Sequence, residues 1–123
     1  MARDPFDEDL TTGRAAILGA EVQLLGTLCG EQSSHEKRLE LAQILEHYEF
    51  VEPEHRVVFE SIRALLPRNR VSAPRLAVHL NNRGFPSVEL EKYVAVALPD
   101  LQMALKLARR LRAFRSEPQP DVR

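Results

Sequence analysis

Residues 50–66, FVEPEHRVVFESIRALL, form the stretch that decides the fold. Pro53 suits the first position of a helix, because its missing N–H would have no partner inside the helix there. On a helix that starts at Pro53, the apolar side chains and His55 fall within an arc of about 120°. The stretch therefore predicts a central helix that packs by one face. Its expected core motif consists of Phe50, Pro53, His55, Val58, Phe59 and Ile62.

Apolar residues recur at helical spacing through the rest of the chain. They predict further helices over 14–29, 35–46, 72–83, 87–98 and 100–115. Ser33 or Ser34, Ser72 and Ser87 lie just before or at the start of three of these segments and can cap them. Pro99 ends the fifth helix, so the last two form a helical hairpin or a sharply kinked pair. The predicted class is all-α, a compact bundle of about six helices that ends in a helical hairpin.

The length of 123 residues predicts one small domain. Residues 14–115 are expected to form it, with a flexible acidic tail over 1–13 and a second flexible tail over 116–123. A charged content of 28% argues against a membrane protein. The single cysteine, Cys29, lies on an apolar stripe and is expected in the core. With no signal sequence recognised, these features indicate a cytoplasmic protein.

The predicted helix over 100–115 has two unusual properties. Its apolar side chains occupy about 200° of the circumference, whereas one packed face needs about 100°. Either the hairpin partner covers this surface or another chain does. The other face carries Lys106, Arg109 and Arg110, and residues 101–115 contain no acid. These three residues are candidate contacts to nucleic acid or to an acidic partner, although a solvated helix face accounts for them as well.

No recognised catalytic or phosphate-binding motif is present, so the sequence predicts a non-enzyme without cofactor or metal. Glutamates and histidines gather over 46–55, but their spacing matches no metal site. His55 is instead expected to be buried or half-buried, with local hydrogen bonds. The segment 72–83 looks like the second helix of a helix-turn-helix, and such helices read DNA bases through Asn and Arg. Its candidate side chains are Arg75, His79, Asn81, Asn82 and Arg83.

The central stretch resembles a motif of a known family. Phe50, Pro53, His55, Arg56 and Phe59 match the F-x-x-P-x-H-R-x-I-F-x-x-I stretch in the amino-terminal domain of DnaB-type replicative helicases. Residues 19–28, GAEVQLLGTL, are similar to the first helix of that domain, typically E-A-E-Q-x-V-L-G-x-L-L. Further along, the similar positions are Leu76, Leu80, Arg83, Gly84 and Tyr93. The chain differs from the family pattern at 72–74 and 85–87, and it stops where a linker and ATPase domain would follow.

The resemblance implies a helical domain whose last hairpin pairs with another copy. In those helicases the domain engages primase, whose own helicase-binding domain is structurally similar. On this basis Met103, Leu107, Leu111 and Phe114 would face a second copy. We therefore expect a non-enzymatic interaction module that self-associates and docks a helicase or primase. The alternative is a small DNA-binding regulator that uses helix 72–83 or the basic face of helix 100–115.

Overall fold

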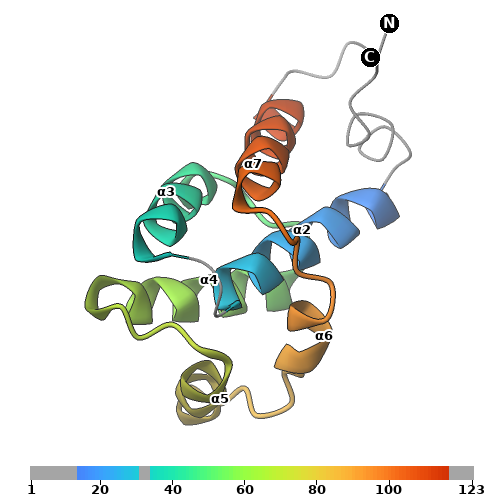
Figure 1. Ribbon diagram of the computed structural model, residues 1–123. Helices are drawn as coiled ribbons and strands as arrows, with labels where there is room; N and C mark the ends of the chain where they lie inside the picture. The colour runs from blue at the N-terminus through green and yellow to red at the C-terminus, as the bar shows by residue number, and fades with distance from the viewer. Residues whose placement is uncertain (1–13, 31–33, 117–123) are drawn as a thin grey trace, which may run out of the picture.

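The computed structural model describes residues 14–30 and 34–116 (Figure 1). The predicted tails, apart from Ser116, lie outside these residues. The described residues contain helices and no strand, which confirms the all-α class. None of the described helices is long and apolar enough to cross a membrane. The elements are α2 (Arg14–Cys29), α3 (His35–Glu46), α4 (Pro53–Leu65), the 3-10 turn η1 (Leu66–Arg68), α5 (Ala73–Asn82), α6 (Leu90–Val94) and α7 (Leu101–Ser116).

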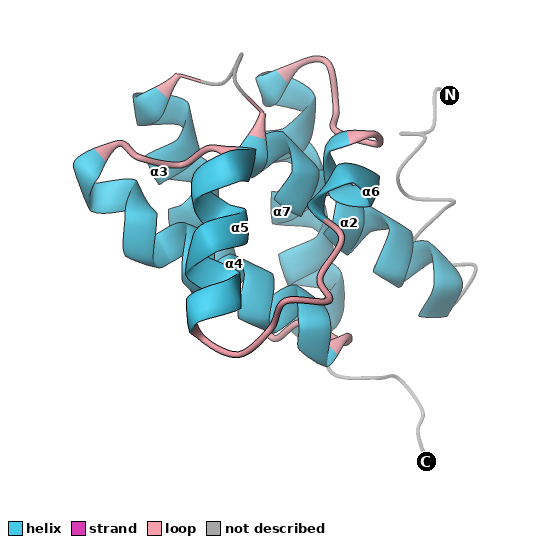
Figure 2. Cartoon of the chain, turned by 90° about the horizontal axis from the view of Figure 1, so that it is seen from below, coloured by secondary structure: helices cyan, strands magenta, loops and turns pink. Residues whose placement is uncertain are grey.

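Helix α2 is the centre of the bundle, a position that the sequence had assigned to the helix starting at Pro53. It packs against α3, α4, α6 and α7, and the last half of the helix is buried (Figures 1 and 2). Its sequence is apolar on nearly all sides, which suits a helix surrounded by others. Gly26 is required where α6 crosses, because a Cβ atom there would lie 1.9 Å from the carbonyl oxygen of Tyr93.

Helix α4 begins at Pro53 and buries the predicted face: His55, Val58, Phe59 and Ile62 lie in the core. The other two members of the expected core motif differ. Pro53 is exposed, so it starts the helix without entering the core. Phe50 is half-buried and packs at 5.3 Å from the Phe59 ring, centroid to centroid.

Helix α6 is shorter than the predicted helix over 87–98. It begins after Glu89, so Ser87 does not cap it, and it ends at Val94. Beyond Val94 the backbone hydrogen bonds span three residues instead of the four of an α-helix. They run from the Val96 N–H to the Tyr93 carbonyl and from the Ala97 N–H to the Val94 carbonyl. The Leu98 N–H then donates to the Thr27 hydroxyl at 2.9 Å. A side chain of α2 thus binds the segment that the apolar spacing assigned to a longer helix.

Helices α6 and α7 do not pack side by side, so of the two predicted arrangements, a hairpin or a sharply kinked pair, the hairpin is not formed. Helix α7 packs against α2 and α3, whereas α6 packs against α2 and α5 (Figure 1). The wide apolar surface of α7 is covered by the two helices of its own chain. The buried residues of this surface are Ala104, Leu105, Leu107, Ala108 and Leu111.

This packing corrects the expected interface with a second copy. Leu107 and Leu111 are 1% and 0% exposed in the single chain, so their side chains have no surface left for another chain. Met103 is 38% exposed and Phe114 is half-buried, and these two remain at the surface. Neither expected explanation for the wide apolar stripe describes the cover seen here: α2 and α3 of the same chain cover it, and the preceding helix α6 does not.

Candidate interaction surfaces

A buried carboxylate joins α2 to the start of α4. Glu21 is 0% exposed, and its Oε2 accepts hydrogen bonds from the Tyr48 hydroxyl and, at 2.8 Å, from the Val51 N–H. Its Oε1 lies 2.7 Å from Nδ1 of His55, whose side chain is 7% exposed. Glu21 therefore fixes both the loop before α4 and the first turn of α4.

The electrostatics of this cluster favour a charged Glu21. Burial raises the pKa of Glu21, but the hydrogen bonds from His55, Tyr48 and the Val51 N–H outweigh burial and bring it below its ordinary value. An ionised carboxylate only accepts hydrogen bonds, so Nδ1 of His55 must carry a proton and donate it. His55 is buried as expected, but its partner lies 34 residues away and is not local.

Tyr93 of α6 extends the cluster on the other side of His55. The two rings meet edge to face, with centroids 5.7 Å apart. The Tyr93 hydroxyl donates to Oε1 of Glu54 at 2.5 Å. Burial, and then the Glu54 carboxylate, raise the pKa of Tyr93 far above its usual value, so this hydroxyl stays protonated and donates.

A pocket of about 400 Å³ opens beside this cluster. His55 and Tyr93 line it together with Glu52 and Glu54 of the α4 start. Leu18, Gly19 and Val22 of α2 and Lys92 of α6 complete the lining. The pocket thus combines an apolar wall from α2 with a wall that carries two carboxylates.

A second cavity, of about 560 Å³, lies between α5 and α6, and we call it the α5–α6 groove. Its lining is mostly apolar, from Ala73, Pro74 and Ala77 on α5 to Val88, Leu90, Val94 and Ala95 around α6. Two acids, Glu89 and Glu91, also line it, and both are exposed. A groove of this kind, apolar inside and acidic at one edge, has the chemistry of a peptide-binding surface.

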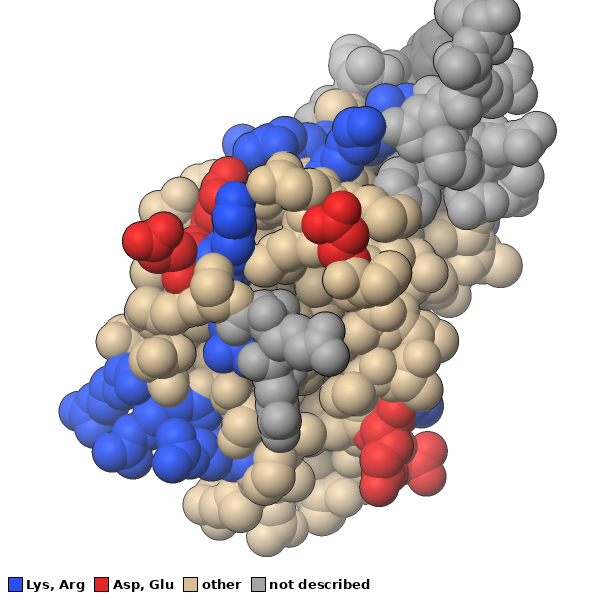
Figure 3. Space-filling model, viewed as in Figure 1, with Lys and Arg blue, Asp and Glu red and all other residues tan. Residues whose placement is uncertain are grey.

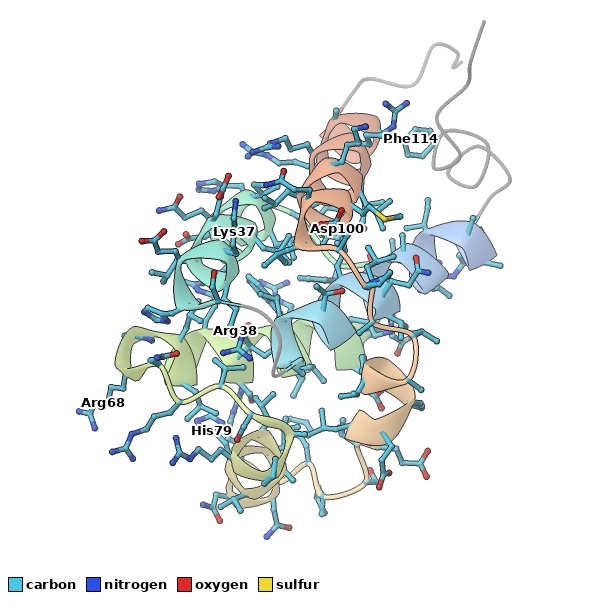
Figure 4. The ribbon with its side chains drawn as sticks, viewed as in Figure 1. Lys37, Arg38, Arg68, His79, Asp100 and Phe114 are labelled. Atoms are coloured by element: carbon cyan, nitrogen blue, oxygen red, sulfur yellow. The ribbon has the colours of Figure 1, made fainter. Side chains whose placement is uncertain are left out.

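The predicted basic contacts on α7 differ in exposure and pairing. Lys106 is exposed, Arg110 is half-buried, and Nη2 of Arg109 lies 3.3 Å from Oε2 of Glu40 on α3. Figure 3 shows Lys and Arg side chains along α7 and another group at the opposite end of this face, with single basic side chains and acids between them. In Figure 4, Arg68 marks the second group and lies far from Phe114 on α7. The two groups are therefore not a continuous basic surface.

The predicted base-reading residues of α5 are also divided. Arg83 binds α4, through Nη1 to the Ser61 hydroxyl at 3.1 Å and Nη2 to Oε1 of Glu60 at 3.4 Å. His79 is half-buried, whereas Arg75, Asn81 and Asn82 are exposed. A single reading face that includes all five side chains is not formed.

Cys29 and Arg38 have structural roles at the contact between α2 and α3. Cys29 is in the core as expected, and burial raises the pKa of its thiol to about 12, which suppresses the reactive thiolate. Arg38 points from α3 to the end of α2 and donates to the Leu28 and Gly30 carbonyls (Figure 4). Within residues 14–30 and 34–116, no three His, Cys, Asp or Glu side chains are placed to hold a metal ion.

From the sequence, Glu21 was noted only as part of the stretch that resembles the helicase domain. Its role as a buried hydrogen-bond acceptor was missed. The available signal was its position among Ala20, Leu24 and Leu25, where a charge interrupts the apolar face of a helix. The α5–α6 groove had no such signal, because it depends on where α6 ends.

Comparison of the chain with family models, with curated proteins and with solved structures gives no match. Interpretation of these surfaces therefore depends on their own geometry and chemistry.

Proposed function

We propose that this protein is a non-enzymatic interaction module, built like the amino-terminal domain of DnaB-type replicative helicases, that docks a DNA-replication protein such as a helicase or primase. One observation supports this proposal most. The three separate stretches that carry the resemblance meet around one cluster, in which Glu21 binds His55 and His55 contacts Tyr93.

The contacts give a physical reason for keeping these residue types together. A buried carboxylate needs hydrogen-bond donors, and His55 and the N–H of Val51 supply two of them to Glu21. Gly26 of the first stretch lies against the backbone of Tyr93, where no side chain fits. The resemblance thus includes residues that contact one another in the folded chain. This favours a common fold over a chance similarity of helical patterns.

The α5–α6 groove is the surface that we assign to the partner. We propose that its occupant is a partner helix with an apolar face and basic flanking residues, because Glu89 and Glu91 are exposed at an otherwise apolar lining. Val94 is 39% exposed and supplies apolar surface to the groove. A large apolar side chain that is left accessible in a groove is typical of a protein-binding surface.

The test compares two valines that differ in their position relative to the groove. Binding of the purified replicative helicase and of the primase from the same organism is measured by calorimetry. Val94→Glu should weaken binding by about tenfold or more, because it places a third acid in the apolar lining. Val96→Glu is the matched control, since Val96 is 43% exposed, only two residues away, and outside the groove.

Equal effects of the two substitutions would show that the groove is not the docking surface. No binding of either replication protein would refute the proposed class of partner. Light scattering of the protein alone, alongside these titrations, would identify a second copy as the occupant if Val94→Glu abolished a dimer.

The second candidate function is DNA binding, and it is favoured by three exposed arginines: Arg68 in η1, Arg70 in the loop that follows, and Arg75 in the first turn of α5. Affinity for duplex DNA should then fall steeply with salt, since each phosphate contact releases counterions. Arg68→Ala with Arg70→Ala should weaken binding, and Arg109→Ala with Arg110→Ala tests the α7 group separately. Binding that is insensitive to salt would exclude this mechanism.

A further inference from the structure

The pocket beside His55 has a polar floor that the fold itself does not use. His55 lines it, and its Nδ1 is held at 2.7 Å by Glu21 in the interior. Nε2, on the opposite edge of the ring, has no hydrogen bond to any described residue and is not sealed from water. The His55 side chain, 7% exposed, lines this pocket, and Nε2 is its ring nitrogen without a partner among the described residues.

The protonation of His55 decides what this nitrogen can bind. Because the ionised Glu21 can only accept, the Nδ1 proton is fixed on the interior side of the ring. In the neutral ring Nε2 then carries the lone pair and is an acceptor. The floor of the pocket thus calls for a hydrogen-bond donor from the ligand.

The side of the pocket formed by the start of α4 adds carboxylates to this acceptor. Glu54 uses Oε1 for the Tyr93 hydroxyl and keeps Oε2 for a ligand. Glu52 forms no ion pair or hydrogen bond through its side chain with any described residue, and Lys92 across the pocket does not neutralise it. Two carboxylates and an imidazole that line one pocket favour a cation with several donors in a fixed geometry.

The opposite wall is apolar and has room. Leu18 and Val22 supply it, and between them Gly19 has nothing within 4 Å of the place that a Cβ atom would occupy. An aliphatic stem can lie along this wall while its charged end reaches the carboxylates. The volume of about 400 Å³ is within the range of ligand pockets.

We propose that this pocket binds a guanidinium group, and that its natural ligand is an arginine side chain of a protein partner. Guanidinium offers five N–H donors in one plane, which matches two carboxylates and an imidazole nitrogen better than the compact charge of lysine does. The arginine stem packs on Leu18 and Val22. The pocket shares α6 with the α5–α6 groove but no lining residue, so it deepens the proposed interaction function with a separate anchor point.

The experiment is a titration with Nα-acetyl-arginine-N-methylamide, followed by the imidazole nitrogen signals of His55 in NMR. A saturable shift of Nε2 is expected. The citrulline analogue, which has the same shape without charge, should not produce it. The lysine analogue should bind more weakly, and free arginine should bind no better than the blocked compound.

Two variants locate the site without disturbing the fold. Glu52→Gln removes one charge at a side chain with no structural bond and should weaken affinity by about tenfold, whereas Glu36→Gln on α3 should leave it unchanged. Gly19→Leu should abolish binding, because its side chain enters the open space of the pocket. Circular dichroism checks that both variants remain folded.

The proposal is overturned if the His55 signal does not saturate or if citrulline shifts it equally. It is also overturned if Gly19→Leu binds normally. Binding of free arginine alone would refute the protein-borne source, since the blocked compound carries the peptide bonds of a partner chain. Because the ligand here is a small compound, these outcomes are independent of whether helicase or primase binds the groove.

Discussion

Helices α4 and α7 close the same core against α2 in different ways. Helix α4 is joined to α2 by the buried Glu21–His55 contact, with a further hydrogen bond from the loop ahead of it. Helix α7 places a ridge of buried Ala and Leu side chains on α2 and α3, and its ion pair with α3 is at the surface. Hydrogen bonds have direction and select one partner, whereas apolar burial does not. The polar contact therefore specifies the position of α4, and the apolar contact mainly adds stability.

The largest effect is expected on the α4 side. Glu21→Ala leaves the Tyr48 hydroxyl, the Val51 N–H and the His55 ring without their buried acceptor. The free energy of unfolding should fall by about 3–5 kcal/mol in urea denaturation. Glu36→Ala, an exposed acid on α3, should change it by less than about 1 kcal/mol. A small effect at Glu21 would mean that directional bonds do not hold α4.

On the α7 side, Leu111→Ala should lower the free energy of unfolding by about 2–5 kcal/mol, since it leaves a cavity at a fully buried position. Urea denaturation measures this loss. The control is Leu39→Ala, because Leu39 is 39% exposed and its truncation creates no cavity. Equal, small losses at both positions would show that α7 is not packed into the core.

The same comparison shows how far the sequence could predict the fold. Apolar spacing and caps are local, and they placed α2, α3 and α7 almost to the residue. The width of the α7 stripe correctly indicated that one packed face was not enough. It could not indicate which surface provides the cover, because an apolar stripe packs equally well on any apolar partner.

Errors arose where a distant polar group controls the chain. After α6 ends, the Leu98 N–H binds the Thr27 hydroxyl, which is 71 residues away in sequence. The partner of His55 is 34 residues away. Both candidate cavities have lining residues on α6, which ends at Val94. Helical periodicity predicted a longer helix here, so it could not predict these cavities.

Acid should weaken the α4 contact and spare the α7 contact. The folded pKa of Glu21 is below its ordinary value of 4.5, because the hydrogen bonds to its carboxylate outweigh the effect of burial. Its stabilisation is complete above pH 4.5 and is lost as the pH falls through the folded value. The stability difference between the native protein and Glu21→Gln should therefore shrink as the pH falls below 4.5 and through the folded pKa of Glu21, as measured by urea denaturation. The Leu111→Ala difference should stay constant; a Glu21→Gln difference that persists in acid contradicts the assignment of a charged Glu21.

The smallest effect is expected for the surface ion pair of α7. Arg109 and Glu40 have side chains that are 59% and 44% exposed, so solvent screens their attraction. Arg109→Ala should change the free energy of unfolding by less than about 1 kcal/mol in the same assay. A larger loss would show that α7 depends on charge as well as on apolar burial.

Within one molecule, α2 and α3 bury the ridge of Ala and Leu side chains on α7. Hydrogen exchange of the α7 amides, measured over a wide range of protein concentration, tests it most directly. If α2 and α3 provide the cover, the protection of these amides is strong and independent of concentration. Protection that appears only as the concentration rises would contradict the account, because a second copy would then be covering α7.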